Sequence, residues 1–368
     1  MPMWVAIHAL SCIPGAAGAQ GMGCIGFPAH PVIELTRRCN LSCIHCHAQS
    51  GSAERPDLTT REIFTLLDQL ARVEEFRMVA FTGGEPLLCP DLFEILEYAK
   101  NLGFSTTLTS NGTMITRDVA HRLADAGVAI VAISLDATDA STHDKIRGTP
   151  GAHDLALKGI EAVKEAGITL QINVTIASYN ENQIMALIKE AEKLGAAILI
   201  MYQMVPVGRG SDIADQSLGI EANKKFSESI AEGQASVGVV IEPVAGPQYW
   251  AHLLHRAGIR SGLLLKILEY IYHGCSAGRG FIYIKSDGEV LACPFIPLSC
   301  GNVRDTPCDQ IYHESSLFQT LKNRNLLLGY CGQCQYRNLC GGCRGRAYAM
   351  NQDICAEDPA CFLRGTTS

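Results

Sequence analysis

Three cysteines stand within eight residues in the stretch TRRCNLSCIHCHAQS, as Cys39, Cys43 and Cys46. Thiolates bind soft metal ions and iron–sulfur clusters. Because a structural zinc ion needs four ligands, three thiols in one tight loop favour a [4Fe–4S] cluster with one iron open to a non-protein ligand. The alternatives are a zinc site completed by His45 or His47, and a redox-active thiol pair.

A second group of cysteines gathers toward the end of the chain. Its members are Cys331, Cys334, Cys340, Cys343 and Cys361, with Cys275 and Cys293 further upstream. This run would by itself also suit a zinc ribbon. Three other cysteines are interpreted as plain thiols, namely Cys89, Cys300 and Cys308. No role is assigned to the two cysteines near the N-terminus, Cys12 and Cys24.

The whole chain has 368 residues, a formal net charge of −7 and 16 cysteines. This charge does not indicate nucleic acid or anionic lipid as a main partner. No uninterrupted apolar run approaches the roughly 18 residues that a membrane span needs. The cysteines are too few for a disulfide scaffold in a chain of this length, so their clustering predicts metal ligands in a reducing compartment, the cytoplasm.

A repeating strand–helix pattern must position these residues. The predicted strands are 32–36, 77–84, 104–112, 128–136, 168–176 and 196–208. The predicted helices are 58–73, 90–103, 116–127, 152–167 and 180–195. Thr59 and Glu62 have the spacing of a capping box at the start of the first helix. Six units are too few for a closed eight-unit barrel, so the pattern predicts an α/β fold with a partial (β/α)6 TIM-like barrel.

Candidate functional residues recur where the predicted strands end. The cysteine loop follows the first strand, and the motifs TGGEP, TSNG and SLD end the second, third and fourth. Active sites of such folds lie at the carboxyl ends of parallel strands. The sequence therefore predicts that all four segments face one site.

Outside the barrel, the chain divides into three further parts. Residues 1–30 are interpreted as a flexible leader, because they lack the basic start of a secretory signal. The barrel core is assigned to 31–235, and 236–272 to an irregular and then helical linker. A small cysteine-rich domain is assigned to 273–368. It opens with a β-hairpin over 281–295, which turns at an Asp-Gly pair.

The loop C-x3-C-x2-C and the motif GGEP resemble the signature of the radical S-adenosylmethionine (SAM) superfamily over roughly residues 30–235. The resemblance implies that Cys39, Cys43 and Cys46 hold a [4Fe–4S] cluster whose open iron is chelated by SAM. Reduction of that cluster then cleaves SAM to a 5′-deoxyadenosyl radical, which takes a hydrogen atom from the substrate.

The same resemblance implies further residues around SAM. They are GGEP (Gly83, Gly84, Glu85, Pro86) at the methionine amino group, His45 on the adenine, Ser110 and Asn111 near the SAM carboxylate and substrate, Ser134 and Asp136 on the ribose-contacting strand, and Arg147 paired with the SAM carboxylate. For the residues outside GGEP, an ordinary turn or core role is the alternative.

The cysteine-rich tail resembles the SPASM extension, which carries auxiliary [4Fe–4S] clusters. The family pattern implies two ligand sets: Cys331, Cys334, Cys340 and Cys361 for one cluster, and Cys275, Cys293 and Cys343 for the other. This chain lacks the further cysteine that the family often places shortly after the first. The second set therefore has an open iron, which could contact substrate or bind Cys300, Cys355 or a histidine. Cys355 is also the alternative to Cys361.

Several stretches resemble the tetrapyrrole branch of SPASM enzymes, in particular the haem synthases of the alternative haem pathway and their relatives in haem d1 synthesis. They are VPVGRG, GCSAGRGF, CGQCQYRNLCGGCRGRAYA and AEDPAC. The resemblance implies oxidative decarboxylation of two propionates of iron-coproporphyrin III to vinyl groups, giving haem b, with a flavodoxin or ferredoxin as electron donor. Arginines suit the substrate carboxylates, and the candidates are Arg209, Arg279, Arg344 and Arg346. The alternative for each is an ordinary surface arginine or one that supports a cluster.

Three other interpretations remain. A related enzyme could modify other tetrapyrrole side chains, and a SPASM maturase would form thioether or carbon–carbon crosslinks in ribosomally made peptides. Many such maturases carry an N-terminal peptide-binding domain, for which residues 1–30 are too short. A non-enzymatic iron–sulfur electron carrier would not need GGEP or the other strand-end motifs.

Overall fold

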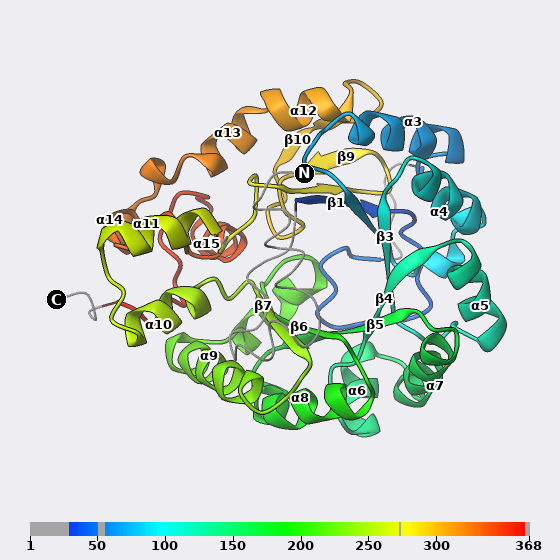
Figure 1. Ribbon diagram of the computed structural model, residues 1–368, viewed down its shortest axis with the longest axis horizontal. Helices are drawn as coiled ribbons and strands as arrows, with labels where there is room; N and C mark the ends of the chain where they lie inside the picture. Colours follow the sequence, from blue (N-terminus) through cyan, green and yellow to red (C-terminus); the bar gives the residue numbers. More distant parts are fainter. Residues whose placement is uncertain (1–28, 51–55, 272–273, 365–368) are drawn as a thin grey trace.

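One curved sheet forms the centre of the protein (Figure 1). The computed structural model describes residues 29–50, 56–271 and 274–364, and within them the sheet has ten strands in the order β10-β9-β8-β1-β2-β3-β4-β5-β6-β7. The strands are β1 (His30–Glu34), β2 (Met78–Thr82), β3 (Ser105–Ser110), β4 (Val128–Ser134), β5 (Thr169–Ile176), β6 (Ile198–Gln203), β7 (Val240–Val244), β8 (Phe281–Ile284), β9 (Glu289–Leu291) and β10 (Ser299–Asn302).

The barrel part of the sheet is parallel. Strands β1 to β7 pair with their neighbours in sequence order, each in parallel. The predicted α/β fold with a parallel sheet is confirmed. The number of strands differs, since a seventh parallel strand, β7, lies in the segment 236–272 that the sequence assigned to an irregular and then helical linker.

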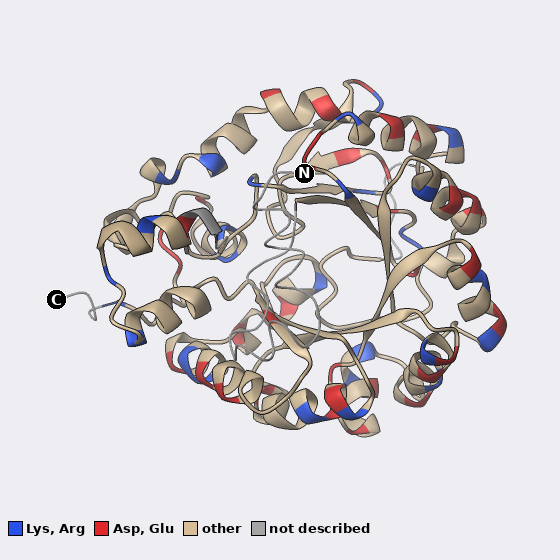
Figure 2. Cartoon of the chain, in the orientation of Figure 1, with Lys and Arg blue, Asp and Glu red and all other residues tan. Residues whose placement is uncertain are grey.

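Helices cover the outer face of the barrel (Figure 1). They are α3 (Thr60–Ala71), α4 (Leu92–Asn101), α5 (Arg117–Asp125), α6 (Ala140–Arg147), α7 (Ala152–Glu165), α8 (Ile184–Lys193) and α9 (Ile220–Gln234), with the 3-10 turns η1 (Pro86–Leu88), η2 (Glu181–Gln183) and η3 (Gly208–Gln216). The predicted capping box at the start of α3 is present. Figure 2 shows acidic and basic residues interspersed along the helices of this outer layer.

The hydrophobic core lies between the sheet and these helices. Alternate strand residues face it, as Ile33 and Phe81 do, and both are fully buried. The residues that alternate with these along each strand point to the opposite face of the sheet. Examples are Glu34 on β1 and Glu242 on β7. Period-two alternation of side chains thus separates an apolar helix-facing layer from a more polar barrel interior.

The cysteine-rich part continues the same sheet. The predicted hairpin is present, because β8 and β9 pair antiparallel and Gly288 has a φ of 85°. However, β8 also pairs in parallel with β1, with His30 opposite Phe281. Helices α10 (Gln248–Arg256), α11 (Gly262–Ile271), α12 (Cys308–Glu314), α13 (Ser316–Lys322), α14 (Gly329–Gln333) and α15 (Arg344–Asn351), with η4 (Arg324–Leu326), complete this side.

The predicted leader falls mostly outside the described residues, which begin at residue 29. Its last residue, His30, already belongs to β1, two residues before the predicted start of that strand. Cys12 and Cys24 also lie outside the described part. In the part that the structure covers, no helix is long and apolar enough to cross a membrane.

Candidate functional site

The cysteine loop follows β1 and is fixed by the end of α6. The backbone N–H of Ser42 donates to the carbonyl of Arg147 at 3.2 Å, and that of Ile44 donates to the carbonyl of Ile146 at 3.0 Å. The helix ends at Gly148, whose left-handed φ of 67° few other residues adopt. A methyl group there would stand 2.6 Å from the Ser42 carbonyl oxygen. The loop therefore rests directly on the end of this helix.

The start of η3 holds the loop from the other side. The guanidinium of Arg209 donates to the carbonyls of Cys43 and Ser50, each at 2.9 Å, and its backbone N–H donates to the carbonyl of Cys46 at 3.0 Å. The preceding Gly208 has a φ of 59°. Arg209 was a candidate for binding a substrate carboxylate, but here its guanidinium positions the cysteine loop.

The GGEP turn after β2 lies against the same loop. The N–H groups of Gly84 and Glu85 donate to the carbonyls of Thr36 and Arg38, at 2.7 and 2.8 Å. A methyl group on Gly83 would stand 2.7 Å from the Thr36 carbonyl oxygen, and one on Gly84 would collide with the Arg38 carbonyl. The two glycines thus allow the two backbones to pair at close range.

Glu85 is fully buried and links the ends of β2 and β3. Its carboxylate accepts from the Ser110 hydroxyl at 2.8 Å, the Asn111 N–H at 2.9 Å and the Leu87 N–H at 3.3 Å. Burial raises the pKa of Glu85 to about 7, although these hydrogen bonds oppose the shift. Pro86 begins η1 and is buried. Ser110 and Asn111 therefore support the GGEP carboxylate from the neighbouring strand.

A buried ion pair joins the end of β4 to the cysteine loop. The Arg147 guanidinium lies 2.8 Å from a carboxylate oxygen of Asp136, and Nε2 of His45 lies 3.8 Å from the same oxygen. Nδ1 of His45 lies 3.4 Å from the Tyr179 hydroxyl. Burial lowers the pKa of His45 to about 4. Ser134, the last residue of β4, is half-buried.

The three loop thiols fit an iron–sulfur cluster by their chemistry. The Leu41 N–H donates to Sγ of Cys39 at 3.4 Å, and the Arg147 guanidinium donates to Sγ of Cys43 at 3.7 Å. Such N–H···S bonds are a standard means of tuning clusters. Among the described residues, no three His, Cys, Asp or Glu side chains converge as ligands of a single ion would. In a cubane cluster each thiolate binds a different iron.

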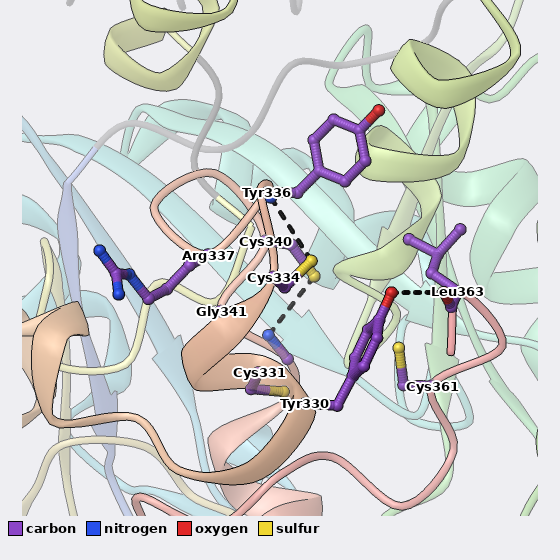
Figure 3. Close-up of a pocket in the computed structure, with 10 residues that line it drawn as sticks. Tyr330, Cys331, Cys334, Tyr336, Arg337, Cys340, Gly341, Cys361 and Leu363 are labelled. Carbon is purple, nitrogen blue, oxygen red and sulfur yellow. Dashed lines mark hydrogen bonds between the residues drawn. The ribbon is translucent and has the colours of Figure 1, made fainter. Parts of the chain in front are cut away.

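The C-terminal tail brings four of the predicted ligands around one pocket. Cys331, Cys334, Cys340 and Cys361 line it (Figure 3). Tyr330, Tyr336 and Leu363 form its apolar walls, and the Tyr330 hydroxyl donates to the Leu363 carbonyl. Cys355 is absent from this lining; its N–H is bound to the Asp353 carboxylate.

Backbone N–H groups donate to the sulfurs of this pocket. The N–H groups of Tyr336, Gly342 and Asp358 donate to Sγ of Cys334, Cys340 and Cys331 respectively, each at 3.4 Å. The Arg344 guanidinium also donates to Sγ of Cys331, at 3.7 Å. Four thiols with this shell of donors suit a fully ligated cluster.

The second predicted set adjoins the first. The Cys275 N–H donates to the Cys340 carbonyl at 3.2 Å. Cys293 follows β9, and Cys343 caps α15 by accepting from the Arg346 N–H at 3.4 Å. Burial is the main reason why the pKa of Cys293 lies well above its usual range, and the neighbouring thiols of Cys275 and Cys343 raise it further. The three thiols are therefore neighbours in space.

The remaining described thiols lie elsewhere. Cys300 is in β10 beside Ser315, Cys308 begins α12 and is fully buried, and Cys89 follows η1. All cysteines of the described residues are free thiols.

The structure gives the other candidate arginines internal partners. Arg346 forms two hydrogen bonds with Asp358, at 2.8 and 2.9 Å. Arg344 is fully buried and donates to the carbonyls of Gly342, Ile354 and Ala356. Arg279 donates to the Asn338 carbonyl at 3.0 Å. Arg344 and Arg346, proposed as ligands of substrate carboxylates, instead support the cysteine segments, because burial commits their donors to the chain itself.

Two functional neighbours were missed by sequence reasoning. Asp358 accepts from the Cys343 N–H at 2.7 Å, and Arg324 donates to the Cys275 carbonyl at 2.6 Å. Asp358 lies within the stretch AEDPAC, but no spacing rule distinguishes it there. Nothing in the sequence around Arg324 marks it.

Comparison with known proteins gives matches over both parts of the chain. The model of the radical SAM superfamily matches residues 33–191, and that of the SPASM iron–sulfur cluster-binding domain matches 275–335. The AdoMet-dependent heme synthase of Oleidesulfovibrio alaskensis is 35% identical over 343 residues, covering 91% of this chain and 88% of the relative. The Fe-coproporphyrin III synthase of Methanosarcina barkeri is 34% identical, covering 90% and 88%.

A solved structure shares the fold. SuiB of Streptococcus suis bound to S-adenosylmethionine superimposes with a TM-score of 0.71 at 18% identity. The match covers 91% of this chain and 75% of that one.

Proposed function

Because the chain belongs to the radical SAM superfamily and carries a SPASM iron–sulfur domain, we propose that it converts two propionates of iron-coproporphyrin III to vinyl groups, giving haem b. The predictions of a radical SAM enzyme, of SAM and of [4Fe–4S] clusters as cofactors are confirmed by these matches. The observation that carries the finer proposal is the similarity to an AdoMet-dependent heme synthase over 91% of the chain.

The loop after β1 would hold the cluster that cleaves SAM. In this proposal Cys39, Cys43 and Cys46 are its ligands, and the GGEP turn binds the methionine amino group. When bound, the cluster and SAM supply a 5′-deoxyadenosyl radical that removes a hydrogen atom from the substrate. Asp136 is assigned to the ribose and Arg147 to the SAM carboxylate, and the ion pair between them would hold both side chains beside the cysteine loop.

The remaining SAM contacts stay proposals as well. His45 lies in the loop beside Asp136 and is assigned to the adenine, and Ser134 at the end of β4 to the ribose. Ser110 and Asn111 already bind Glu85, so they would act on SAM by orienting that carboxylate.

The proposed reaction leaves one electron to remove from each propionate. Loss of a β-hydrogen atom and then of carbon dioxide gives the vinyl group and one electron. Cys275, Cys293 and Cys343 would hold a cluster with one iron left without a cysteine ligand, and we assign to this site the supply of an electron acceptor. The cluster of Cys331, Cys334, Cys340 and Cys361 would pass the electron on. A flavodoxin or ferredoxin in a reducing cytoplasm would supply the electron for SAM cleavage.

The test is an anaerobic reaction of the reconstituted enzyme with SAM, a strong reductant and iron-coproporphyrin III, read by mass spectrometry. We expect stepwise loss of one and then two carboxyl groups, with deoxyadenosine formed. Deoxyadenosine with an unchanged porphyrin would contradict the proposed substrate.

Two cysteine variants locate the two parts of the reaction. Cys39→Ala should abolish deoxyadenosine formation, because it removes a ligand of the SAM-cleaving cluster. Cys334→Ala should leave SAM cleavage partly intact and lose the porphyrin product. Deoxyadenosine production by Cys39→Ala would make the central assignment wrong.

A related tetrapyrrole reaction is the second candidate, supported by the 34% identity to an Fe-coproporphyrin III synthase. Offering the same enzyme a tetrapyrrole that carries acetate side chains distinguishes it, since loss of acetate groups would then replace loss of propionate carboxyls. Ribosomally made peptides are the third class to test if both tetrapyrroles are returned unchanged.

A further inference from the structure

A buried arginine stands between the two C-terminal cysteine sets. Arg324 begins η4 and is 5% exposed. One of its terminal nitrogens donates to the Cys275 carbonyl at 2.6 Å. A methyl group on Gly341 would stand 2.6 Å from the central carbon of the guanidinium. The guanidinium therefore lies against the backbone beside Cys340, while it is also bonded to Cys275.

In the part of the chain that the structure describes, this cation has no acidic partner. Among the described residues it forms no ion pair, and its Nε and Nη1 atoms are buried without a hydrogen-bond partner. The charged and ionisable groups that act on it most are the thiols of Cys275 and Cys340 and the guanidinium of Arg344. An unpaired buried charge is costly and is seldom kept without a compensating group.

The other buried arginines show what compensation looks like here. Arg346 is as deeply buried and is bound by both oxygens of Asp358, and Arg147 is bound by Asp136. Arg344 is also buried without an acidic partner, but its guanidinium donates to three carbonyls. Among the described residues, Arg324 differs from all three arginines because two of its guanidinium nitrogens are buried without a hydrogen-bond partner. A cluster held by either cysteine set would supply the missing counter-charge, because thiolate-ligated clusters are anionic.

We propose that Arg324 is a potential-setting residue that compensates the charge of both auxiliary clusters and raises their reduction potentials. Reduction adds one negative charge to a cluster, so a fixed cation beside it stabilises the reduced form more than the oxidised form. Clusters poised in this way accept an electron more readily. The inference rests on the two ligand sets proposed above and explains how the acceptor required by the proposed reaction is tuned.

The test is a redox titration of the full-length, anaerobically reconstituted enzyme, followed by electron paramagnetic resonance without SAM or tetrapyrrole. Arg324→Gln keeps a donor for the Cys275 carbonyl but removes the charge. We expect it to shift the auxiliary-cluster potentials to more negative values and to leave the SAM-cleaving cluster unchanged. Arg324→Lys keeps the charge and should leave all potentials close to those of the wild type.

Arg364→Gln is the matched control, because it removes the same charge from the same tail. Arg364 is part-exposed and pairs with Glu357 at 3.0 Å, so its loss should shift no potential. Unchanged auxiliary potentials in Arg324→Gln with full iron content would overturn the proposal. Equal shifts in Arg324→Lys and Arg324→Gln would also overturn it, since they would indicate a structural role.

The same two variants show how a loss of auxiliary-cluster iron is to be interpreted. If Arg324→Gln loses auxiliary iron while Arg324→Lys keeps both iron and potentials, charge compensation is supported. If both lose iron equally, the proposal is wrong. Because no substrate enters the titration, failure of the haem-synthase assignment would not change any of these outcomes.

Discussion

At the scale of single residues, Gly208 shows how closely the cysteine loop is packed. A methyl group on it would stand 2.5 Å from the carbonyl oxygen of Cys46, whereas ordinary contact begins at 3.4 Å. To make room for the methyl group, Gly208→Ala must therefore move the cysteine loop by nearly the difference between these two distances. Since a misplacement of about 1 Å near the reacting groups can cost roughly 100-fold in rate, we expect a loss of that order in deoxyadenosine formation.

The control for this prediction is Gly167→Ala. Gly167 also has a left-handed φ, of 74°, but a methyl group there would contact nothing within 4 Å. Both variants pay the cost of about 1–2 kcal/mol for an L-residue in this conformation. Only Gly208→Ala should slow SAM cleavage at full iron content, and equal activities in the two variants would contradict the proposed packing role.

The cysteine loop could be singled out from the sequence because its three thiols lie within one short stretch. The partners of long side chains could not be predicted in the same way. Arg209 is bound to Cys43, which lies 166 positions away, and Arg346 is bound to Gln203, which lies 143 positions away. No local pattern encodes such contacts, so the sequence could not decide whether these arginines bind a substrate carboxylate or support the cysteine segments.

At the scale of elements, the start of α3 joins the barrel to the cysteine-rich part. Thr59 accepts from the Glu62 N–H, and the Glu62 carboxylate also accepts from Arg304 at 2.7 Å. Thr59→Ala removes this cap, so we expect about 1 kcal/mol less free energy of unfolding, measured by anaerobic urea denaturation. Thr65→Ala, at an exposed position in the same helix, should change the free energy of unfolding by less than half as much. Equal losses of unfolding free energy in the two variants would argue against a stabilising role of the cap.

The missed strand β7 has a physical explanation. Its sequence, VIEPV, places Glu242 in the middle of an apolar run and Pro243 beside it, and both weaken a strand prediction. The proline is tolerated because β7 is the last strand of the sheet and pairs on one side only. Strands β2 to β6 contain no proline, and Pro31 in β1 comes before residue 32, where that strand was predicted to start. The alternation of these six strands with helices was sufficient to predict them.

At the scale of the whole molecule, the two predicted domains form one structure. The pairing of β8 with β1 joins segments about 250 residues apart, and no local signal could have indicated it. Polar contacts reinforce the join: the Asn223 side chain on α9 donates to the Ala360 carbonyl at 2.7 Å, and Arg346 on α15 donates to Gln203 at the end of β6 at 2.6 Å. Damage at this junction should therefore affect both parts.

Asp358 provides the sharpest test of that junction. It is fully buried and accepts from Arg346, from the Gln248 side chain of α10 at 2.6 Å and from the Cys343 N–H. Asp358→Ala leaves the Arg346 charge buried and without its acidic partner. Such a change typically lowers the free energy of unfolding by about 3–5 kcal/mol. We expect a matching loss in the free energy of unfolding and less auxiliary iron.

The matched comparison is the exposed pair of Lys193 and Glu190, which lies 3.0 Å apart on α8. Lys193→Ala should cost less than about 1 kcal/mol, because solvent screens such pairs. If the cysteine-rich part were an independent domain, Asp358→Ala would unfold it in a separate transition and leave the barrel at its wild-type midpoint. A single transition shifted as a whole is what a shared sheet requires, because β1 cannot lose β8 without exposing its own edge.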